Sequence, residues 1–469
     1  AGDIEGGTAM GIETEANREA GMEAETRAET AAETAAKAAA KAAKAGTPDT
    51  GAAATGATAG TAAGPAAATA AVPGGGTLRL TAAQAMMRWL SVQMIEPEPS
   101  GSEAAGQEPR PSSSAAAGQE PQPPSSAAAG PERGAPERFI AGVWAIFGHG
   151  NVAGIGEALH GIGERLPTWR GQNEQTMAHA AIAFAKTRAR RRAMAVTASI
   201  GPGSTNLVTA AALAHVNRLP VLFLCGDVFA NRRPDPVLQQ IEDFDDGTVS
   251  ANDCFRPVTR YFDRITRPEQ LLTALPRAMR TMTDPADCGP VCLAFCQDVQ
   301  AEAYDFPAAF FAPRVWRIRR AEPDPVEVAA VVAAIRAAAA PVIVSGGGVL
   351  YSGAGELLAD FAARRNIPIV ETQAGKGATS FAHPMNFGSP GVTGSACGNE
   401  ACAAADLVIG VGTRFQDFTT GSWTVFSNPG RKLVSINVHG YDALKHGALG
   451  VVGDAKATLA RIDAALGET

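Results

Sequence analysis

Two series of short apolar runs, each alternating with stretches of helical spacing, dominate the chain from residue 139 onwards. Alternation of this kind predicts parallel strands joined by helices, because such strands are buried on both faces. The first series lies between residues 139 and 306, and the second between about 324 and 466. We expect strands at 143–147, 193–198, 220–227 and 291–295 in the first series, and at 341–345, 367–371, 407–412 and 433–437 in the second.

This pattern predicts an α/β protein with two doubly wound parallel-sheet domains. The first domain is expected at 77–306 and a second, Rossmann-like domain at 325–469, with a linker at 307–324. Near the start of the first domain, the apolar spacing predicts a helix that follows Thr81. A threonine at this position is suited to cap the helix, because its hydroxyl can accept a hydrogen bond from a free backbone N–H.

Two segments lack the apolar residues that a core requires. Residues 1–76 consist mainly of Ala, Gly, Thr and Glu, and residues 96–137 are rich in Pro, Ser, Gly and Gln. Neither segment can bury enough apolar surface to offset the entropy lost on ordering. We therefore expect a disordered N-terminal extension and a flexible insertion within the first domain.

Charge and cysteine usage narrow the class of protein. The net charge of −7 disfavours a nucleic-acid-binding face, and no run of 18 strongly apolar residues predicts a membrane span. The seven cysteines include no Cys-x-x-Cys pair, which favours reduced thiols and a cytoplasmic protein. Cys288, Cys292 and Cys296 are spaced by four, but they flank or lie in a predicted buried strand, so we interpret them as small packing residues rather than metal ligands.

Polar side chains gather at the predicted carboxyl edge of the first sheet, where ligands bind in folds of this type. Glu174 follows a predicted strand and opens an alanine-rich helix, while His149 lies between two glycines at another strand end. Glu174 could act in proton transfer, or it could serve only as a favourable carboxylate in a first helical turn. His149 could relay a proton or bind a polar substrate, or it could be structural.

Two glycine-rich turns also follow predicted strands. The turn Gly201-Pro202-Gly203 would let the backbone approach a flat ring, and Asn206 just beyond it could bind a cofactor or substrate. A turn of this composition is also common without any ligand. The run at 346–348 resembles a phosphate-cradling turn, but it completes no Gly-x-Gly-x-x-Gly motif, so tight packing of a strand against a helix is the favoured interpretation.

Several runs together resemble the trihydroxycyclohexanedione hydrolases, which are thiamine diphosphate-dependent enzymes of inositol breakdown. The resemblance extends from residue 77 to about 466, apart from the insertion. Two of its runs, Gly148-His149-Gly150-Asn151 and the one at 235–242, distinguish it from acetohydroxyacid synthases of the same fold. The matching runs lie at 77–85, 146–152, 171–181, 226–230, 234–242, 371–377 and 412–420.

The resemblance implies a pyrimidine-binding domain followed by a middle domain, thiamine diphosphate as cofactor, and hydrolysis of a carbon–carbon bond in a cyclic polyol dione. Glu174 matches the glutamate that shares a proton with the cofactor's pyrimidine ring and so activates the cofactor. We assign catalysis to Glu174 and His149. The residues expected to bind the cofactor are Glu174, Gly201, Pro202, Gly203 and Asn206.

The resemblance also implies a C-terminal domain that binds diphosphate and Mg²⁺ through a Gly-Asp-Gly turn, and a homodimer or homotetramer. The nearest run here is Gly453-Asp454-Ala455, and only 14 residues follow it. We therefore expect no metal ligand in this chain, and we expect it to be a fragment with little activity alone. Two alternatives stay open, namely a thiamine-dependent lyase or synthase of the acetohydroxyacid synthase type, and a truncated paralogue without catalytic activity.

Overall fold

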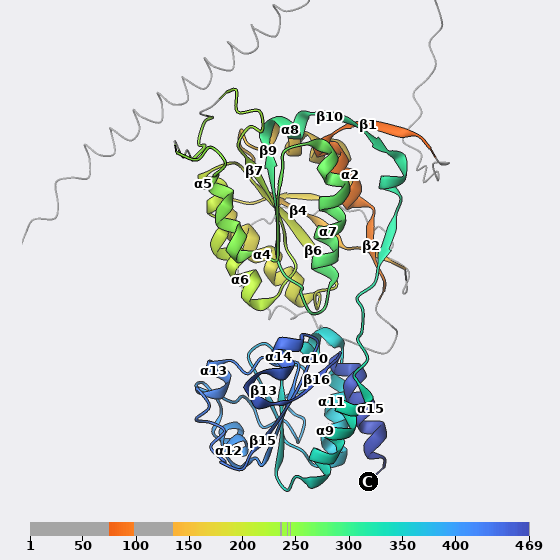
Figure 1. Cartoon of the computed structure of the whole chain (residues 1–469), viewed down its shortest axis with the longest axis vertical. Helices are drawn as coiled ribbons and strands as arrows, with labels where there is room; N and C mark the ends of the chain where they lie inside the picture. The colour runs from red at the N-terminus through yellow and green to blue at the C-terminus, as the bar shows by residue number, and fades with distance from the viewer. Residues whose placement is uncertain (1–74, 98–134, 235–236, 242, 244, 469) are drawn as a thin grey trace, which may run out of the picture. The chain divides into compact units, whose positions relative to one another are not determined.

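The computed structural model describes residues 75–97, 135–234, 237–241, 243 and 245–468. The extension expected at 1–76 therefore lies almost entirely outside the described residues, and so does most of the insertion expected at 96–137. Within the described part, α/β architecture with parallel sheets is confirmed (Figure 1).

The first sheet has six parallel strands in the order β5-β4-β6-β7-β9-β8. Every residue of β6, β7 and β9 is buried, as expected for central strands covered on both faces. The strand expected just before Glu174 is the exposed β5, whereas β8 was not predicted, because it carries two charged residues and so forms no apolar run. The strands are β4 Ile140–Ala145, β5 Thr168–Arg170, β6 Ala193–Ala198, β7 Leu222–Asp227, β8 Tyr261–Ile265 and β9 Val291–Cys296.

Helices cover both faces of this sheet (Figure 1). One core layer joins the strands to α2, α3 and α7, and the opposite layer joins them to α4 and α6. Thr81 caps α2 as expected, and it forms a capping box with Gln84. The helices of this region are α2 Ala82–Ser91, α3 Glu157–Ile162, α4 Glu174–Thr187, α5 Pro202–Thr205, α6 Val208–Asn217, α7 Leu271–Thr283 and α8 Gln297–Ala301.

Two small sheets tie the start of the described chain to residues more than two hundred positions later. Strand β1 (Thr77–Thr81) pairs antiparallel with β10 (Ala303–Pro307). Strand β2 (Gln93–Ile95) pairs with both β3 (Glu137–Arg138) and β11 (Arg314–Trp316). The segment predicted as a linker, 307–324, thus contains a strand, and the buried indole of Trp316 donates to Gln93 Oε1 at 2.9 Å.

The second sheet has five parallel strands in the order β13-β12-β14-β15-β16. Helices α9, α11 and α15 pack on one face, and α12 packs on the other. The four predicted strands are present, and the four-residue β16 is additional. The elements are β12 Pro341–Ser345, β13 Ile369–Glu371, β14 Leu407–Val411, β15 Lys432–Asn437, β16 Leu449–Val452, α9 Pro325–Ala337, α10 Gly347–Ser352, α11 Gly355–Arg365, α12 Ala396–Ala404, α13 Asp417–Thr420, α14 Gly440–Leu444 and α15 Ala455–Leu466.

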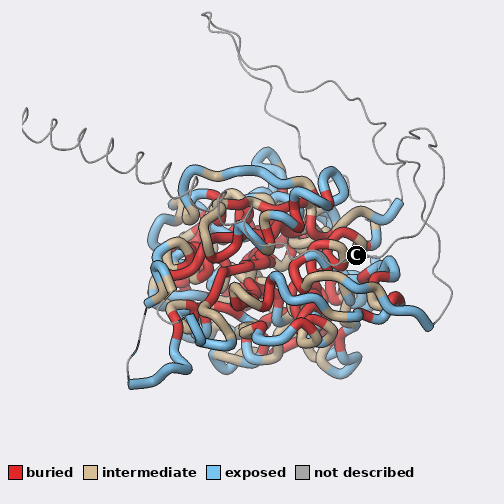
Figure 2. Tube along the Cα trace, turned by 90° about the horizontal axis from the view of Figure 1, so that it is seen from above, coloured by how far each residue is buried: buried red, intermediate tan, exposed pale blue. Residues whose placement is uncertain are grey.

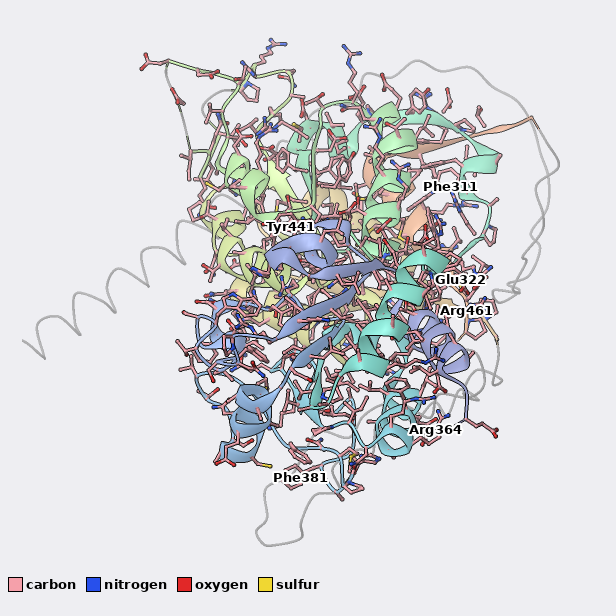
Figure 3. The ribbon with its side chains drawn as sticks, turned by 60° about the horizontal axis from the view of Figure 1, so that its bottom comes forward. Phe311, Glu322, Arg364, Phe381, Tyr441 and Arg461 are labelled. Atoms are coloured by element: carbon pink, nitrogen blue, oxygen red, sulfur yellow. The ribbon has the colours of Figure 1, made fainter. Side chains whose placement is uncertain are left out.

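Helix α15 is held at its surface by arginine–carboxylate pairs (Figure 3). Arg461 Nε lies 3.0 Å from Glu322, and both side chains are more than 60% exposed. Arg364 and Arg365 both pair with Asp463, at 2.7 and 3.1 Å. An exposed pair such as Arg461–Glu322 contributes at most about 1 kcal/mol, so the burial of Leu459 and Ile462 anchors the helix.

The buried cysteines are packing residues. All seven cysteines are free, and Cys288, Cys292 and Cys296 are buried as expected. Burial raises the pKa of the Cys288 thiol to about 11, so this thiol stays protonated at neutral pH. Figure 2 shows the burial of the described residues, with buried segments running through the interior.

Candidate active site

Glu174 is the first residue of helix α4. The helix begins there because Asn173 has extended backbone and its side chain accepts a hydrogen bond from Thr176 N at 3.0 Å. The carboxylate of Glu174 therefore stands in the first turn of the helix, at the positive end of the helix dipole. Glu174 is half-buried, so it is neither a surface residue nor a core residue.

A side chain from another element fixes one oxygen of this carboxylate. Asn206 Nδ2, at the C-terminal end of α5, donates to Glu174 Oε2 at 2.8 Å. In the part of the chain that the structure describes, no hydrogen bond reaches Glu174 Oε1. The carboxylate is thus held in one orientation and keeps a free oxygen for a ligand.

The turn before α5 shapes the space beside this carboxylate. Gly201 has φ +66°, and a Cβ on it would lie 1.9 Å from the carbonyl oxygen of Gln239, so only glycine fits. A Cβ on Gly203 would lie 3.6 Å from Glu174 Oε1, so Gly203 leaves open the room beside that oxygen. Pro202 occupies the first turn of α5, where its missing N–H costs no hydrogen bond.

His149 lies in a rigid turn after β4. Asn151, which is buried, accepts from Gly148 N at 2.9 Å and donates to Ile146 O and Thr197 Oγ1 at 3.0 and 3.1 Å. The half-buried His149 has a buried Nε2 with no hydrogen-bond partner among the described residues. A buried imidazole nitrogen without a partner is costly unless a ligand satisfies it.

Glu174, Asn206 and the turns that carry His149 and Gly201 meet at the carboxyl edge of the first sheet. Gly150 N donates to Ser199 Oγ at 3.1 Å, which places the His149 turn against the end of β6, directly before the Gly201 turn. Glu174 touches Asn206 directly, whereas the structure gives no direct contact between Glu174 and His149. The arrangement therefore places a carboxylate and an imidazole on the same edge of the sheet without a direct contact between them.

Sequence reasoning missed Gln300, which supports the His149 turn from behind. This buried side chain donates to Gly150 O and Phe295 O at 2.8 and 3.0 Å, and accepts from Ile155 N at 3.2 Å. All of its hydrogen-bonding groups are engaged with backbone, so it positions the turn rather than reacting. The one signal for Gln300 in the sequence is a polar residue placed one turn after a predicted buried strand.

Asp227 also lies at this edge, but its carboxylate is already paired. Arg264 Nε donates to Asp227 Oδ2 at 2.7 Å, and its Nη2 donates to Ser250 Oγ and Asp253 Oδ1. Burial opposes ionisation of Asp253, but hydrogen bonds from Ser250, Arg256 and Arg264 together hold the pKa of Asp253 below its usual value. This network fixes the loop that follows β7.

The parts of the chain that contain the two parallel sheets each match a known protein-family domain. Residues 149–246 match the thiamine pyrophosphate enzyme N-terminal TPP binding domain, and residues 328–462 match the thiamine pyrophosphate enzyme central domain. The chain belongs to the thiamine pyrophosphate enzymes. All of the predicted site residues from His149 to Asn206 fall within the first matched region.

Individual relatives carry a more specific name, 3D-(3,5/4)-trihydroxycyclohexane-1,2-dione hydrolase. The one from Geobacillus thermodenitrificans is 47% identical over 392 residues, which are 84% of this chain and 56% of that protein. One from Clostridium perfringens is 51% identical over 330 residues, 70% of this chain and 52% of that protein. One from Bacillus cereus is 46% identical over 388 residues, 82% of this chain and 55% of that protein. These matches confirm the resemblance, and the chain spans about half the length of the curated relatives.

Among the described residues, no helix combines the length and apolar character needed to cross a bilayer. In the same residues, no group of three or more His, Cys, Asp or Glu side chains is placed to hold a metal ion.

Proposed function

We propose that this chain supplies the pyrimidine-binding and middle domains of a thiamine diphosphate-dependent hydrolase that cleaves a carbon–carbon bond of trihydroxycyclohexane-1,2-dione in inositol breakdown. The observation that carries the proposal is the carboxylate of Glu174, held by Asn206 through Oε2 with Oε1 free. Three relatives at 46–51% identity, each named for this substrate, support the choice of dione.

The residues at this edge fit the cofactor's pyrimidine ring. Glu174 Oε1 is free, and Gly203 leaves room beside it. When bound, thiamine diphosphate supplies a carbon nucleophile for attack on a carbonyl group. Glu174 would hold the cofactor's ring through Oε1 and would share a proton with it there, and the Asn206 hydrogen bond would keep the carboxylate in one orientation.

His149 serves the substrate side of the site in this proposal. Its unpartnered Nε2 binds an oxygen of the dione or moves a proton to or from it. The turn held by Asn151 and Gln300 keeps the imidazole in place, so little reorganisation accompanies the reaction.

The remaining features of the proposal rest on the family. We place the Mg²⁺ ligands and the diphosphate contacts in the part of the relatives that this chain does not span. The active protein is a homodimer or homotetramer in the cytoplasm, acting on a small cyclic polyol dione without nucleic acid or membrane. Seven free cysteines and an acidic net charge of −7 agree with that setting.

The test is turnover of the dione by the enzyme that contains this chain, supplied with thiamine diphosphate and Mg²⁺. We expect the dione to be opened to an acid, and Glu174→Gln to lower turnover by orders of magnitude, because an amide cannot share a proton in the same way. Glu157→Gln is the matched control, since Glu157 is an exposed carboxylate in the first turn of α3. Consumption of pyruvate in place of the dione, or near-normal turnover by Glu174→Gln, would overturn the proposal.

A further inference from the structure

A cavity lies at the amino end of the second sheet, opposite the strand ends at which ligands usually bind in such folds. Strands β15 and β16 both begin beside it, because their first residues, Lys432 and Leu449, line it. Its volume is about 670 Å³, whereas a water molecule takes about 30 Å³ in the liquid. A small organic molecule therefore has room there.

The loop before β15 presents an indole to this cavity from an unusual backbone conformation. Three consecutive residues, Gly421, Ser422 and Trp423, have φ of +53°, +51° and +71°. Glycine adopts such angles freely, whereas other residues in succession there cost free energy. The indole of Trp423 packs on Phe415 and Phe426, with ring centroids 5.9 Å apart in both pairs, and it also lines the cavity. The loop thus holds this ring in one place.

A second aromatic ring, that of His446, reaches the cavity from the segment between α14 and β16. His446 also has left-handed backbone, with φ +63°, and its ring meets that of Trp423 edge-on with centroids 4.9 Å apart. Burial and the charge of Lys445 lower the pKa of the His446 imidazole, so it is neutral at neutral pH. Strained backbone of this kind persists where structure or function requires the side chain that it carries.

The charge around the cavity is positive and is not balanced by carboxylates. Among the described residues that line it, Arg431 and Lys432 are cations and none is acidic. Arg431 Nη1 donates to Asn428 O at 3.2 Å, and its guanidinium lies 5.6 Å from the centroid of the Trp423 ring. These contacts hold the guanidinium at the cavity and leave most of its five N–H donors available. In the part of the chain that the structure describes, neither cation has a carboxylate partner.

We propose that this cavity binds an aromatic carboxylate, with its carboxylate group held by Arg431 and Lys432 and its ring near His446. The paired N–H donors of a guanidinium match the two oxygens of a carboxylate. Aromatic rings attract one another in edge-on and offset arrangements, so the rings of Trp423 and His446 favour a flat ligand.

The size of the charge and the apolar side chains narrow the ligand further. Two cations beside a neutral imidazole suit one negative charge better than the two of a phosphate monoester. Ala334, Leu433 and Leu449 supply apolar surface that covers the ring of the ligand. This site is separate from the proposed dione site, whose residues belong to the first sheet, so binding here does not depend on which substrate the enzyme uses.

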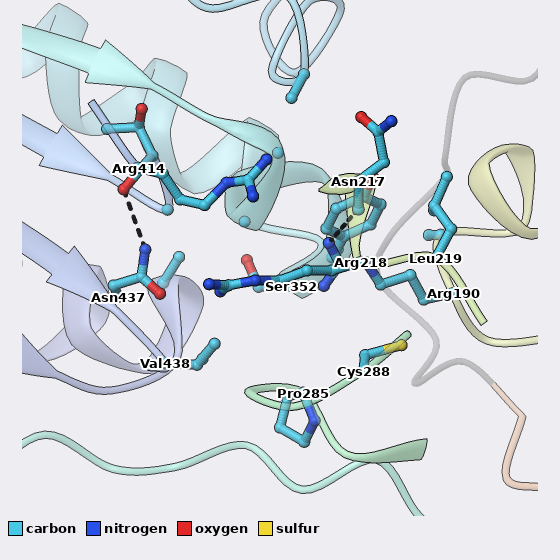
Figure 4. A pocket seen from close by; sticks show the side chains of 18 of the residues that line it. Arg190, Asn217, Arg218, Leu219, Pro285, Cys288, Ser352, Arg414, Asn437 and Val438 are labelled. Carbon is cyan, nitrogen blue, oxygen red and sulfur yellow. Dashed lines mark hydrogen bonds between the residues drawn. The ribbon is translucent and has the colours of Figure 1, made fainter. Parts of the chain in front are cut away.

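The same domain contains another basic cavity, at the carboxyl edge of its sheet, which an organic anion could also enter (Figure 4). Arg414, Asn437 and Val438, which follow β14 and β15, line that cavity. Among the described residues, none lines both cavities. Replacing Arg414 therefore changes one cavity and leaves the lining of the other intact.

Titration calorimetry of the purified protein with 2-naphthoate tests the proposal. Uncharged 2-naphthamide and the non-aromatic carboxylate octanoate are titrated in parallel. We expect one saturable site for 2-naphthoate, with an affinity about tenfold higher than that for 2-naphthamide, because the amide cannot form the charge-assisted hydrogen bonds. Octanoate should bind more weakly than 2-naphthoate, because it has the charge without the ring.

Variants of the lining residues separate the charge from the ring. Arg431→Gln should weaken 2-naphthoate binding about tenfold, and Arg431→Lys should bind with intermediate affinity, because lysine keeps the charge but not the fork. Arg336→Gln is the matched control, since Arg336 is an exposed arginine of α9 that does not line the cavity. His446→Asn removes the ring at a position whose backbone suits asparagine, and it should weaken the binding of 2-naphthoate but not that of octanoate.

Thermal melting reports whether each variant is folded. The proposal is overturned if no saturable binding of 2-naphthoate occurs at millimolar concentration, or if 2-naphthamide or octanoate binds as tightly. Equal affinity of folded Arg431→Gln and the unchanged protein has the same consequence. Arg414→Gln must leave 2-naphthoate binding unchanged, because a loss would place the probe in the cavity at the carboxyl edge.

Discussion

Both parallel sheets have an arginine near their carboxyl edge, but the two arginines are satisfied to very different degrees. At the first sheet, Arg264 is shared between Asp227 and Asp253 and also donates to Ser250. At the second, Arg414 has no carboxylate partner in the described residues and lies among other cations. The same residue type in a similar topological place is paired with carboxylates in one sheet and has no ion-pair partner among the described residues in the other. Its pairing, rather than its position, distinguishes the two residues.

The largest expected effect on stability comes from replacing Arg264, whose guanidinium is paired with carboxylates. Arg264→Met leaves the Asp227 carboxylate, whose side chain is 1% exposed, without its cation. Removing one member of a buried pair costs about 3–5 kcal/mol, so the urea midpoint of unfolding should fall markedly. Arg461→Met is the control, because its pair with Glu322 is exposed on both sides and contributes about 0–1 kcal/mol. Equal midpoints for the two variants would contradict the structural role of Arg264.

A smaller effect is expected from removing the hydrogen bond that orients the Glu174 carboxylate at the edge of the first sheet. Asn206→Ala removes the hydrogen bond to Glu174 Oε2 and leaves both oxygens free to rotate. A hydrogen bond to a charged group contributes about 1.5–3 kcal/mol, which corresponds to a loss of roughly tenfold to a hundredfold in kcat for the dione. Asn217→Ala, at the half-buried C-terminal end of α6, is a control of the same type for the turnover assay. Unchanged kcat in Asn206→Ala would show that the hydrogen bond does not orient the carboxylate.

Replacing Arg414, which has no ion-pair partner among the described residues, should change the stability in the opposite direction to replacing Arg264. The pKa of Arg414 is lowered by burial and by the charges of Arg218 and Arg190, and the charge of Asp442 offsets this only in part. Arg414→Met therefore removes a disfavoured cation while apolar contact is kept. We expect the midpoint of unfolding without ligand to stay the same or to rise, within about 1 kcal/mol. A loss comparable to that of Arg264→Met would mean that Arg414 has a structural role.

The smallest effect concerns pH. The pKa of Asp253 is lowered in the folded protein, so its contribution to stability is complete above the unfolded pKa of about 4 and is lost as the pH falls through the folded value. Asp253→Asn should therefore be less stable than the unchanged protein at pH 6. The difference should shrink below pH of about 4. Urea midpoints at several pH values measure it, and a difference independent of pH would contradict the assignment.

The sequence predicted the central strands best. Strand β6 was expected at 193–198 and found there, because an uninterrupted apolar run is buried on both faces. Edge strands such as β5 lack that signal, since water covers much of their surface. The expected strand at 143–147 is found at Ile140–Ala145, because the turn that carries His149 begins earlier than the apolar run ends.

The residues at the carboxyl edges also differ in how far the sequence could predict them. Glu174 could be identified from its place at a helix start and from the resemblance, but its hydrogen bond to Asn206 joins residues 32 positions apart through a turn that no local pattern specifies. The surroundings of Arg414 were still less accessible. Arg190 and Arg218 come from the ends of α4 and α6, so only the three-dimensional arrangement brings these charges together.

The pairing of β1 with β10 and of β2 with β11 has a consequence for making shortened proteins. Residues 303–316 are synthesised more than two hundred positions after their partners at 77–95. A deletion that removes Thr77–Ile95 would leave two later strands with bare backbone edges, and such edges recruit strands from other molecules. Expression variants designed to begin at residue 135, which keep β4 but lose β1 and β2, should therefore aggregate, whereas those that keep Thr77 retain both pairings.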